Sequence, residues 1–168
     1  MTTSAQSEAA SVFTWPVRVY WEDTDAGGIV FYANYLKFME RARTEWLRCL
    51  GVSQSTLRET TGGMFVVTDT QLAYQHPARL DDQLLVTARV VEKTRITLTI
   101  RQEIRLLPIQ DVRKQLLNSE HTLMTSSELS GFNLVCQGKI RIAWVDATHS
   151  ETGLKPTRIP NNILEKLQ

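Results

Sequence analysis

The sequence predicts an α+β fold in which an antiparallel β-sheet is wrapped around one long helix. Three observations favour this class: a β-like stretch comes first, a single long helical pattern follows, and the rest of the chain carries β-branched residues in strand-like runs. A doubly wound fold needs helices and strands that alternate along the chain, and these do not. The 168 residues fit one domain, with residues 13–168 as its folded part.

The first predicted strand ends in two acids. Residues 1–12 are small, polar and aperiodic, so we expect a disordered tail before it. From Pro16 onward, alternation places five residues on one face of the strand: Val17, Val19, Trp21, Asp23 and Asp25. The turn Ala26-Gly27-Gly28 follows, because glycine can take a positive φ and lets other atoms approach closely.

The long helix is predicted after this turn and stops at Gly51. Its apolar face repeats at helical spacing through Tyr35, Met39, Ala42, Trp46, Cys49 and Leu50. A second, short helix is expected from Ser53, its cap, to about Glu59. The two cysteines, Cys49 and Cys136, fit neither a disulfide nor a zinc pattern, and we interpret both as free core thiols.

The later part of the chain reads as consecutive strands, predicted at residues 64–75, 82–94, 95–107 and 134–146. A sheet that wraps the helix is the simplest solution and is the hot-dog fold, with a ferredoxin-like or cystatin-like sheet as the alternative. The polar segment 107–132 is longer than a hairpin requires, so we expect an extended hairpin or a mobile excursion. An extended piece and a short amphipathic helix bearing Ile163, Leu164 and Leu167 are expected at the end.

Composition and charge exclude several functions. The net charge of +1 supplies no general field for nucleic acid or an anionic membrane. No apolar run approaches the roughly 20 residues of a membrane span, and the first residues lack the pattern of a secretory signal, so we expect a soluble, cytoplasmic protein. The three histidines lack metal-ligand spacing, and no metal site is predicted.

The strand, glycine turn and helix start together suggest a reaction centre. The first turn of a helix leaves free N–H groups that polarise a carbonyl, and an oxyanion donor of this kind is typically worth about 10²- to 10³-fold in rate. A carboxylate beside such donors can attack the carbonyl or activate water. The alternative interpretation is that Asp23 and Asp25 only cap the turn and the helix.

A resemblance to a known family rests on four stretches: RVYWEDTDAGGIVFYANYLKFMERARTEWL, QLAYQHPARLDDQLLV, KIRIAWVD and KPTRIP. They closely resemble the 4-hydroxybenzoyl-CoA-type hot-dog thioesterases, in particular the Tol-Pal-associated, YbgC-like acyl-CoA thioesterases. The resemblance implies hydrolysis of acyl-CoA without a cofactor, since CoA is part of the substrate. It implies Asp25 as the catalytic nucleophile or general base and the backbone N–H of Tyr32 as the group that polarises the carbonyl. Asp23 then supports the structure, and Gly27 and Gly28 give the thioester room.

One departure is Tyr32 itself, where close relatives often carry histidine. A phenol, with a pKa near 10, is a poor base at neutral pH, so the mechanism should depend more heavily on Asp25. The phosphates of CoA require basic residues along the binding path. Lys93 and Arg95 are the predicted substrate-binding residues, and Arg79 and Arg101 are further candidates.

The resemblance also implies partners. Hot-dog relatives form dimers and often tetramers with the active site at a subunit boundary, so we expect a homo-oligomer, a dimer or a dimer of dimers such as a homotetramer. Acyl carrier protein and a role in lipid metabolism are implied in the same way. The alternative function is a non-catalytic module that binds acyl thioesters or acyl carrier protein. A hot-dog dehydratase would need a catalytic histidine on the central helix, and that helix has none.

Overall fold

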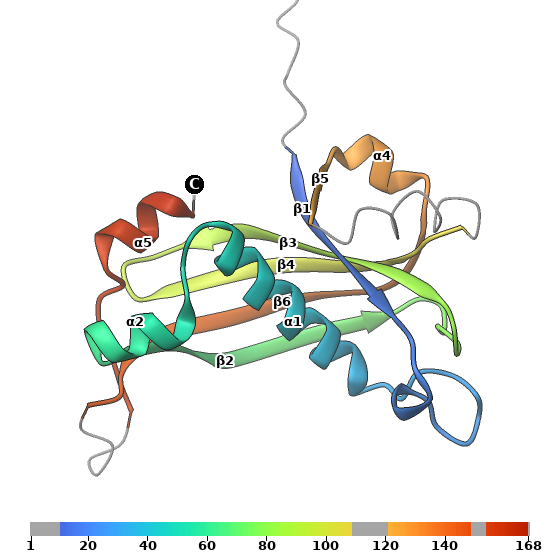
Figure 1. The fold of residues 1–168 in the computed structure, drawn as a ribbon, viewed down its shortest axis with the longest axis horizontal. Helices are drawn as coiled ribbons and strands as arrows, with labels where there is room; N and C mark the ends of the chain where they lie inside the picture. The colour runs from blue at the N-terminus through green and yellow to red at the C-terminus, as the bar shows by residue number, and fades with distance from the viewer. Residues whose placement is uncertain (1–10, 109–120, 149–153, 168) are drawn as a thin grey trace, which may run out of the picture.

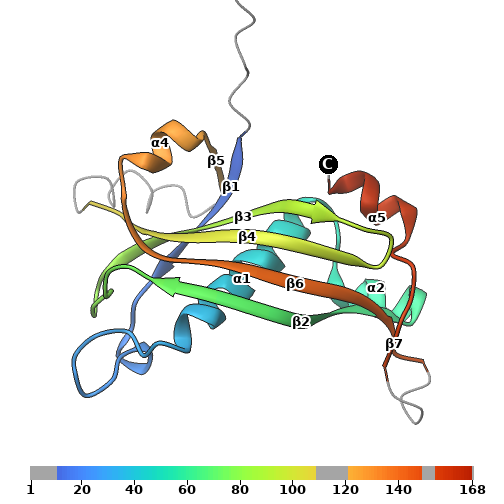
Figure 2. The ribbon, with the colours of Figure 1, turned by 180° about the vertical axis from the view of Figure 1, so that it is seen from behind.

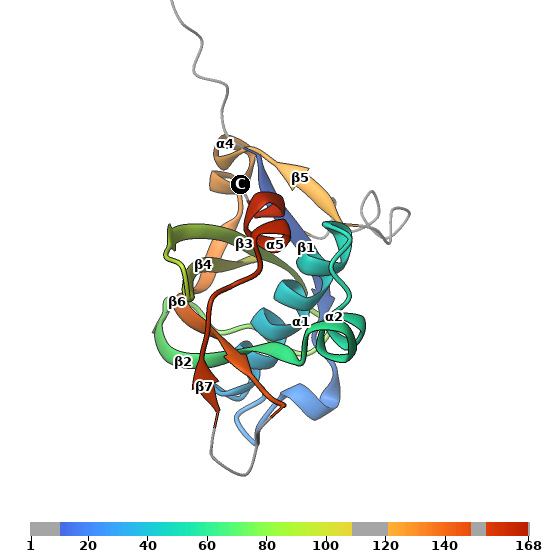
Figure 3. The same cartoon turned by 90° about the vertical axis from the view of Figure 1, so that its left-hand side faces the viewer.

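The computed structural model describes residues 11–108, 121–148 and 154–167. Within these residues a seven-stranded antiparallel sheet forms one layer, and helix α1 (Asn34–Cys49) lies across one of its faces (Figures 1 and 2). Seen from the end, the sheet curves around α1 (Figure 3). The predicted hot-dog arrangement, a sheet wrapped around one long helix, is confirmed.

The strands lie in the order β2-β6-β4-β3-β1-β5, and β7 pairs with β6. The four later predicted strands correspond to β2, β3, β4 and β6. The strand bounds are β1 Val12–Arg18, β2 Gly63–Tyr74, β3 Gln83–Lys93, β4 Thr97–Leu106, β5 Thr122–Met124, β6 Asn133–Asp146 and β7 Lys155–Pro156.

Helix α1 buries one face against the sheet, and this contact forms the core. Its inward residues are Asn34, Tyr35, Phe38, Met39, Ala42 and Leu47. Full burial of each large apolar side chain contributes roughly 1.5 to 3 kcal/mol. The prediction that both cysteines are core thiols is wrong for Cys49, which is exposed, whereas Cys136 is buried; both are free. Successive helical residues turn by about 100°, so Cys49 lies on the opposite side of α1 from the inward Leu47.

Glycines end both of the first two α-helices. Gly51, with φ of 70°, follows α1, and Gly62, with φ of 67°, follows α2 (Gln54–Thr61). Ser53 is the N-cap of α2, as predicted, and its hydroxyl accepts the N–H of Thr56 at 3.5 Å. The turn between α1 and α2 therefore follows directly from residue types that the sequence displays.

The first strand is shorter than predicted. The expected strand from Pro16 to Asp25 is wrong in its second half, because β1 ends at Arg18 and a 3-10 turn, η1 (Trp21–Asp23), follows. The Asp23 carboxylate accepts the N–H of Tyr20 at 2.9 Å and closes this turn, so the strand cannot continue. Trp21 is exposed and Asp23 buried, so the two do not share a face.

Two peripheral segments complete the fold. In the long 107–132 segment, β5 pairs with β1 and α4 (Ser126–Ser130) follows, while residues 109–120 lie outside the described part. Near the end, the predicted short helix is α5 (Asn161–Lys166), which buries Ile163. The predicted disordered tail lies mostly outside the described residues, but Val12 already belongs to β1 and is buried.

Candidate active site

A small loop, residues 24–30, connects η1 with the approach to α1 and carries the predicted catalytic carboxylate. The N–H of Asp25 donates to the carbonyl of Ile29 at 3.0 Å, across the loop. On its outer side, the N–H of Val30 donates to the carbonyl of Ala78 at 2.8 Å. These two hydrogen bonds hold the loop backbone on its inner and outer sides, and they therefore fix the position of Asp25.

The Asp25 side chain has one constrained oxygen and one open oxygen. Its Oδ1 accepts the N–H of Gly27 at 2.7 Å, and its backbone carbonyl accepts the N–H of Gly28 at 2.9 Å. Gly28 takes a φ of 71° at this turn. Oδ2 has no hydrogen-bond partner among the described residues, and the side chain is exposed. The carboxylate is thus oriented by the turn yet accessible to water and ligand.

Asp23 is a structural residue. Only 3% of it is exposed, and its carboxylate closes the η1 turn. Its backbone carbonyl accepts two further donors, the N–H of Phe31 at 2.9 Å and the side-chain amide of Asn34 at 3.0 Å. Asp23 therefore joins η1 to the first residue of α1, which agrees with the supporting role that the resemblance implied.

Tyr32 lies just before α1 and not within it, because the helix begins at Asn34 with Ala33 as its N-cap. Its backbone N–H has no hydrogen-bond acceptor within the described ranges. Its own carbonyl accepts the hydroxyl of Tyr74 at 3.1 Å. The side chain is 63% exposed and leaves the backbone approachable.

Sequence reasoning missed two tyrosines that hold this region. The hydroxyl of Tyr35 accepts the N–H of Ala78 at 3.0 Å, so the residue that supports the Asp25 loop also contacts α1. Burial raises the pKa of Tyr35 and keeps its hydroxyl protonated. Tyr74, on β2, packs against the Tyr35 ring with centroids 5.7 Å apart. No sequence signal reveals these contacts, since they join segments about 40 residues apart.

The predicted phosphate-binding residues Lys93 and Arg95 lie far from Asp25 in the same chain. Strand β3 begins at Gln83, which pairs with Arg18 near the loop, and ends at Lys93. Eleven residues of strand span roughly 35 Å. Lys93 instead donates to the carbonyl of Leu164 at 3.3 Å, which fastens α5 to the β3–β4 hairpin.

Arg79, the weaker candidate, is the basic residue that the structure brings to the loop. It forms an antiparallel bridge with Ile29, and its side chain is exposed. A groove of about 490 Å³ lies nearby between α1 and β2, and its lining starts one turn after Tyr32, at Leu36. The groove is lined by Leu36, Lys37, Glu40, Arg41, Arg43, Val67, Thr70 and Ile140.

Two further findings concern the described residues alone. Across residues 11–108, 121–148 and 154–167, no three His, Cys, Asp or Glu side chains are grouped so as to hold a metal ion. In the same ranges, no helix combines the length and apolar character needed to cross a membrane.

The wrapped helix, with a carboxylate loop directly before it, defines the class: a hot-dog protein with a candidate reaction centre at the helix start. The chain belongs to the thioesterase superfamily, whose model matches residues 27–112. The match begins two residues after Asp25 and includes all of α1, α2, β2, β3 and β4.

Named relatives agree with this family. The chain is 49% identical over 92 residues to the acyl-CoA thioesterase YbgC of Haemophilus influenzae, which covers 55% of this chain and 68% of that protein. It is 34% identical over 158 residues to the acyl-CoA thioester hydrolase YbgC of Escherichia coli O6:H1, covering 94% and 97%. A solved 4-hydroxybenzoyl-CoA thioesterase mutant with bound 4-hydroxybenzoyl-CoA superposes with a TM-score of 0.75 over 95% of this chain and 100% of the other. At 16% identity, that likeness concerns the fold alone.

Proposed function

We infer that the chain is an acyl-CoA thioesterase, which hydrolyses acyl-CoA to a free acid and CoA. Both YbgC relatives carry this activity in their names. In the chain itself, the observation that carries the chemistry is the Asp25 carboxylate, with one oxygen held by Gly27 and the other open. An exposed, oriented carboxylate before a free backbone donor is what acyl transfer to water requires.

Two routes through Asp25 are consistent with this geometry. In the first, Oδ2 attacks the thioester carbonyl carbon, the C–S bond breaks, and CoA leaves as the thiolate; water then hydrolyses the acyl-aspartyl anhydride. In the second, the carboxylate takes a proton from water as the water oxygen attacks the same carbon; the C–S bond then breaks, and the CoA thiolate leaves with the proton that Asp25 had taken up. Both consume one water and release the acid and CoA.

The backbone N–H of Tyr32 supports either route. Negative charge develops on the thioester oxygen when the carbonyl carbon is attacked, and a free N–H that points at this oxygen lowers the barrier. The N–H needs no side chain, so tyrosine in place of histidine leaves this contribution intact. Water is the only co-reactant in either route, and we propose that no cofactor takes part.

We also propose that the protein is a homo-oligomer. Strand β2 forms one edge of the sheet, and over much of its length its residues are exposed. An edge of this length presents unpaired backbone groups that a second copy can cover. The tetramer, an acyl carrier protein partner, and a place in cytoplasmic lipid metabolism stay predictions from the family resemblance.

Free-thiol release from a panel of aliphatic and aromatic acyl-CoAs tests the activity. Asp25→Asn keeps the shape of the side chain and removes its charge, and turnover is expected to fall by at least about 10²-fold. Glu59→Gln removes the same charge at an exposed position of α2 and serves as the control. Circular dichroism and thermal melting establish that both variants fold.

Each outcome decides between the two functions. Loss of turnover in folded Asp25→Asn, with Glu59→Gln near wild type, supports the thioesterase and identifies its acyl class. A wild type that binds acyl-CoA without releasing thiol, or an Asp25→Asn variant with full turnover, favours the binding module or a different reaction centre.

A further inference from the structure

A row of positive charges crosses the sheet on the face opposite α1. Arg101 on β4 is the direct partner of Arg89 on β3 and of Lys139 on β6. Side chains alternate between the two faces, and the neighbours Ile100 and Gln102 are buried on the helix side, so Arg101 points outward. Like charges directly opposite each other on neighbouring strands are destabilising. Three like charges in one row therefore lower the stability of the fold, and a binding function would explain their presence.

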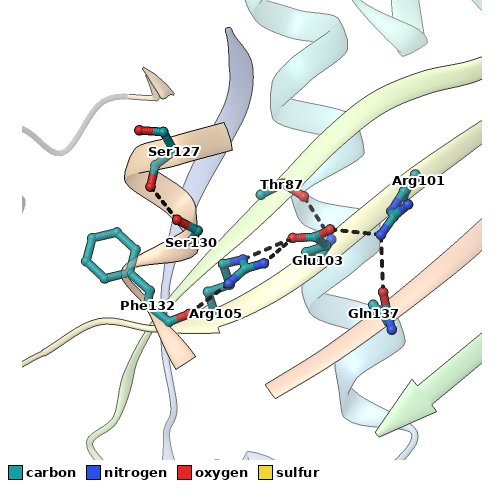
Figure 4. A network of polar contacts seen from close by, with 8 residues as sticks. All are labelled: Thr87, Arg101, Glu103, Arg105, Ser127, Ser130, Phe132 and Gln137. Atoms are coloured by element: carbon teal, nitrogen blue, oxygen red, sulfur yellow. Dashed lines mark hydrogen bonds and ion pairs between the residues drawn. The ribbon is translucent and has the colours of Figure 1, made fainter. Parts of the chain in front are cut away.

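Neighbouring groups neutralise this row only in part. Glu103 accepts two bonds from Arg105, at 2.8 and 3.0 Å, and the third donor group of Arg105 binds the carbonyl of Phe132 at 2.8 Å (Figure 4). Among the described residues, Arg101 has long contacts, to Glu103 at 3.3 Å and to Gln137 at 3.4 Å. The single carboxylate is thus largely engaged by Arg105.

The remaining two cations have no carboxylate partner among the residues that the structure describes. Arg89 and Lys139 are exposed, and neither forms an ion pair with any residue in the described part of the chain. Counting Arg89, Arg101, Arg105 and Lys139 against Glu103, four positive charges meet one negative charge. The unsatisfied charge lies along Arg89, Arg101 and Lys139.

Arg101 also separates two hollows of the surface. One, of about 230 Å³, lies beneath α4 and is lined by Val12, Thr87, Arg89, Arg101, Glu103, Arg105, Ser126 and Leu129. The other, of about 350 Å³, is lined by Gln71, Leu72, Ala73, Arg101, Gln137, Gly138 and Lys139. Each hollow therefore offers Arg101 together with one of the two unpaired cations.

Helix α4, which covers the first hollow, is held in place by contacts within the protein. Thr125 and Glu128 form a reciprocal capping box that fixes the start of α4, with bonds of 2.7 and 3.2 Å. Leu129 is buried, and Arg105 binds the carbonyl of Phe132 just after the helix. Ser126, which lines the hollow, is thereby positioned over the arginines.

We propose that this row binds a ligand with two phosphate groups, one in each hollow, with Arg101 between them. The guanidinium fork pairs with phosphate oxygens in a bidentate manner, and two arginines and a lysine supply the charge. Strands lie about 4.8 Å apart, so the row extends roughly 10 Å, which suits two phosphates better than one carboxylate. Two sources fit: the nucleotide part of CoA, in which case the site rests on the proposed function, or a separate phosphorylated metabolite.

Calorimetric titration with pyrophosphate, adenosine 3′,5′-bisphosphate and CoA tests the site in the full chain. Wild type is expected to bind at least one of these, with an affinity that falls as salt rises. Arg101→Gln is expected to weaken binding by about tenfold or more, and Arg89→Gln and Lys139→Gln by less. Arg141→Gln, an exposed arginine on β6 opposite Asp69, is the matched control and should bind as wild type does.

The proposal fails if wild type binds none of the three at millimolar concentration, or if folded Arg101→Gln binds as tightly as wild type. The source follows from turnover of acyl-CoA compared with acyl-pantetheine, which lacks the nucleotide. A raised KM of Arg101→Gln for acyl-CoA alone assigns the site to the substrate; unchanged KM values with weakened binding assign it to a separate ligand. Calorimetry measures binding without turnover, so the result for this site does not depend on whether the protein hydrolyses acyl-CoA.

Discussion

Two adjacent glycines at the Asp25 turn are required for different reasons. A Cβ on Gly27 would lie 3.0 Å from Oδ1 of Asp25, closer than ordinary contacts allow. A Cβ on Gly28 would meet no atom within 4 Å, but its φ of 71° is unfavourable for any residue with a side chain. Gly27 therefore gives space to the carboxylate, and Gly28 gives the turn its backbone conformation.

Alanine at these two positions should separate activity from stability. Gly27→Ala is expected to displace the carboxylate and lower kcat several-fold, because small errors in the position of a reacting group are costly. The change in melting temperature should be small. Gly28→Ala should instead cost about 1 to 2 kcal/mol of folding free energy, if the loop unfolds with the domain. Thiol-release kinetics and urea denaturation of both variants check this, and equal effects of the two on kcat would contradict it.

At the scale of elements, one buried side chain ties α1 to the sheet. Gln102, on β4, is fully buried and donates to the carbonyls of Met39 at 3.0 Å and Thr87 at 3.1 Å. Its Oε1 accepts a guanidinium N–H of Arg43 at 2.7 Å. Burial lowers the pKa of Arg43. Because the guanidinium is largely removed from water, the hydrogen bond to the Gln102 oxygen replaces part of its hydration.

Gln102→Met should destabilise the protein although it keeps the volume of the side chain. The substitution removes the side-chain acceptor of the Arg43 guanidinium and the side-chain donor to two carbonyls, at a cost of about 2 to 3 kcal/mol. The double variant Gln102→Met/Arg43→Met should recover part of this loss. Gln137→Met, on the other face, is the control and should cost less. Urea denaturation decides; a double variant less stable than the sum of both single losses would contradict the account.

The sequence predicts elements better than it predicts contacts between them. Hydrophobic periodicity identified α1, and capping chemistry identified the start of α2 at Ser53. The extent of β1 was overestimated because alternation takes no account of the Asp23 carboxylate, which binds the backbone of Tyr20. In the same way, no local pattern indicates that Ala78 supports the Asp25 loop and contacts Tyr35. These features depend on hydrogen bonds that form only after the segments meet.

At the scale of the whole molecule, the two edges of the sheet differ. One edge ends in β5, a three-residue strand that covers the start of β1. The other is β2, a strand of 12 residues with a register shift between Val67 and Asp69. The strand order could not be predicted from periodicity, since β2 pairs with β6 across some 70 residues of sequence, and so the open edge could not be predicted either.

Val67 lies at this open edge and also lines the groove between β2 and α1. The Val67 side chain is apolar and 54% exposed, and it lies beside the backbone groups of an edge strand. A subunit interface would cover both of these features. If a second copy pairs along β2, Val67→Lys places a charge within that contact and should weaken the oligomer by about tenfold or more.

Sedimentation velocity over a range of protein concentrations checks this expectation. Wild type should sediment as a dimer or larger species, and Val67→Lys should dissociate at higher concentration than wild type does. Val91→Lys adds the same charge at a 40% exposed valine on β3, which two other strands separate from β2, and it should leave the assembly unchanged. A wild type that is monomeric throughout, or a Val91→Lys variant that dissociates in place of Val67→Lys, would show that β2 is not the assembly edge. If the wild type is monomeric, the Asp25 loop and the groove would have to serve the reaction within a single chain.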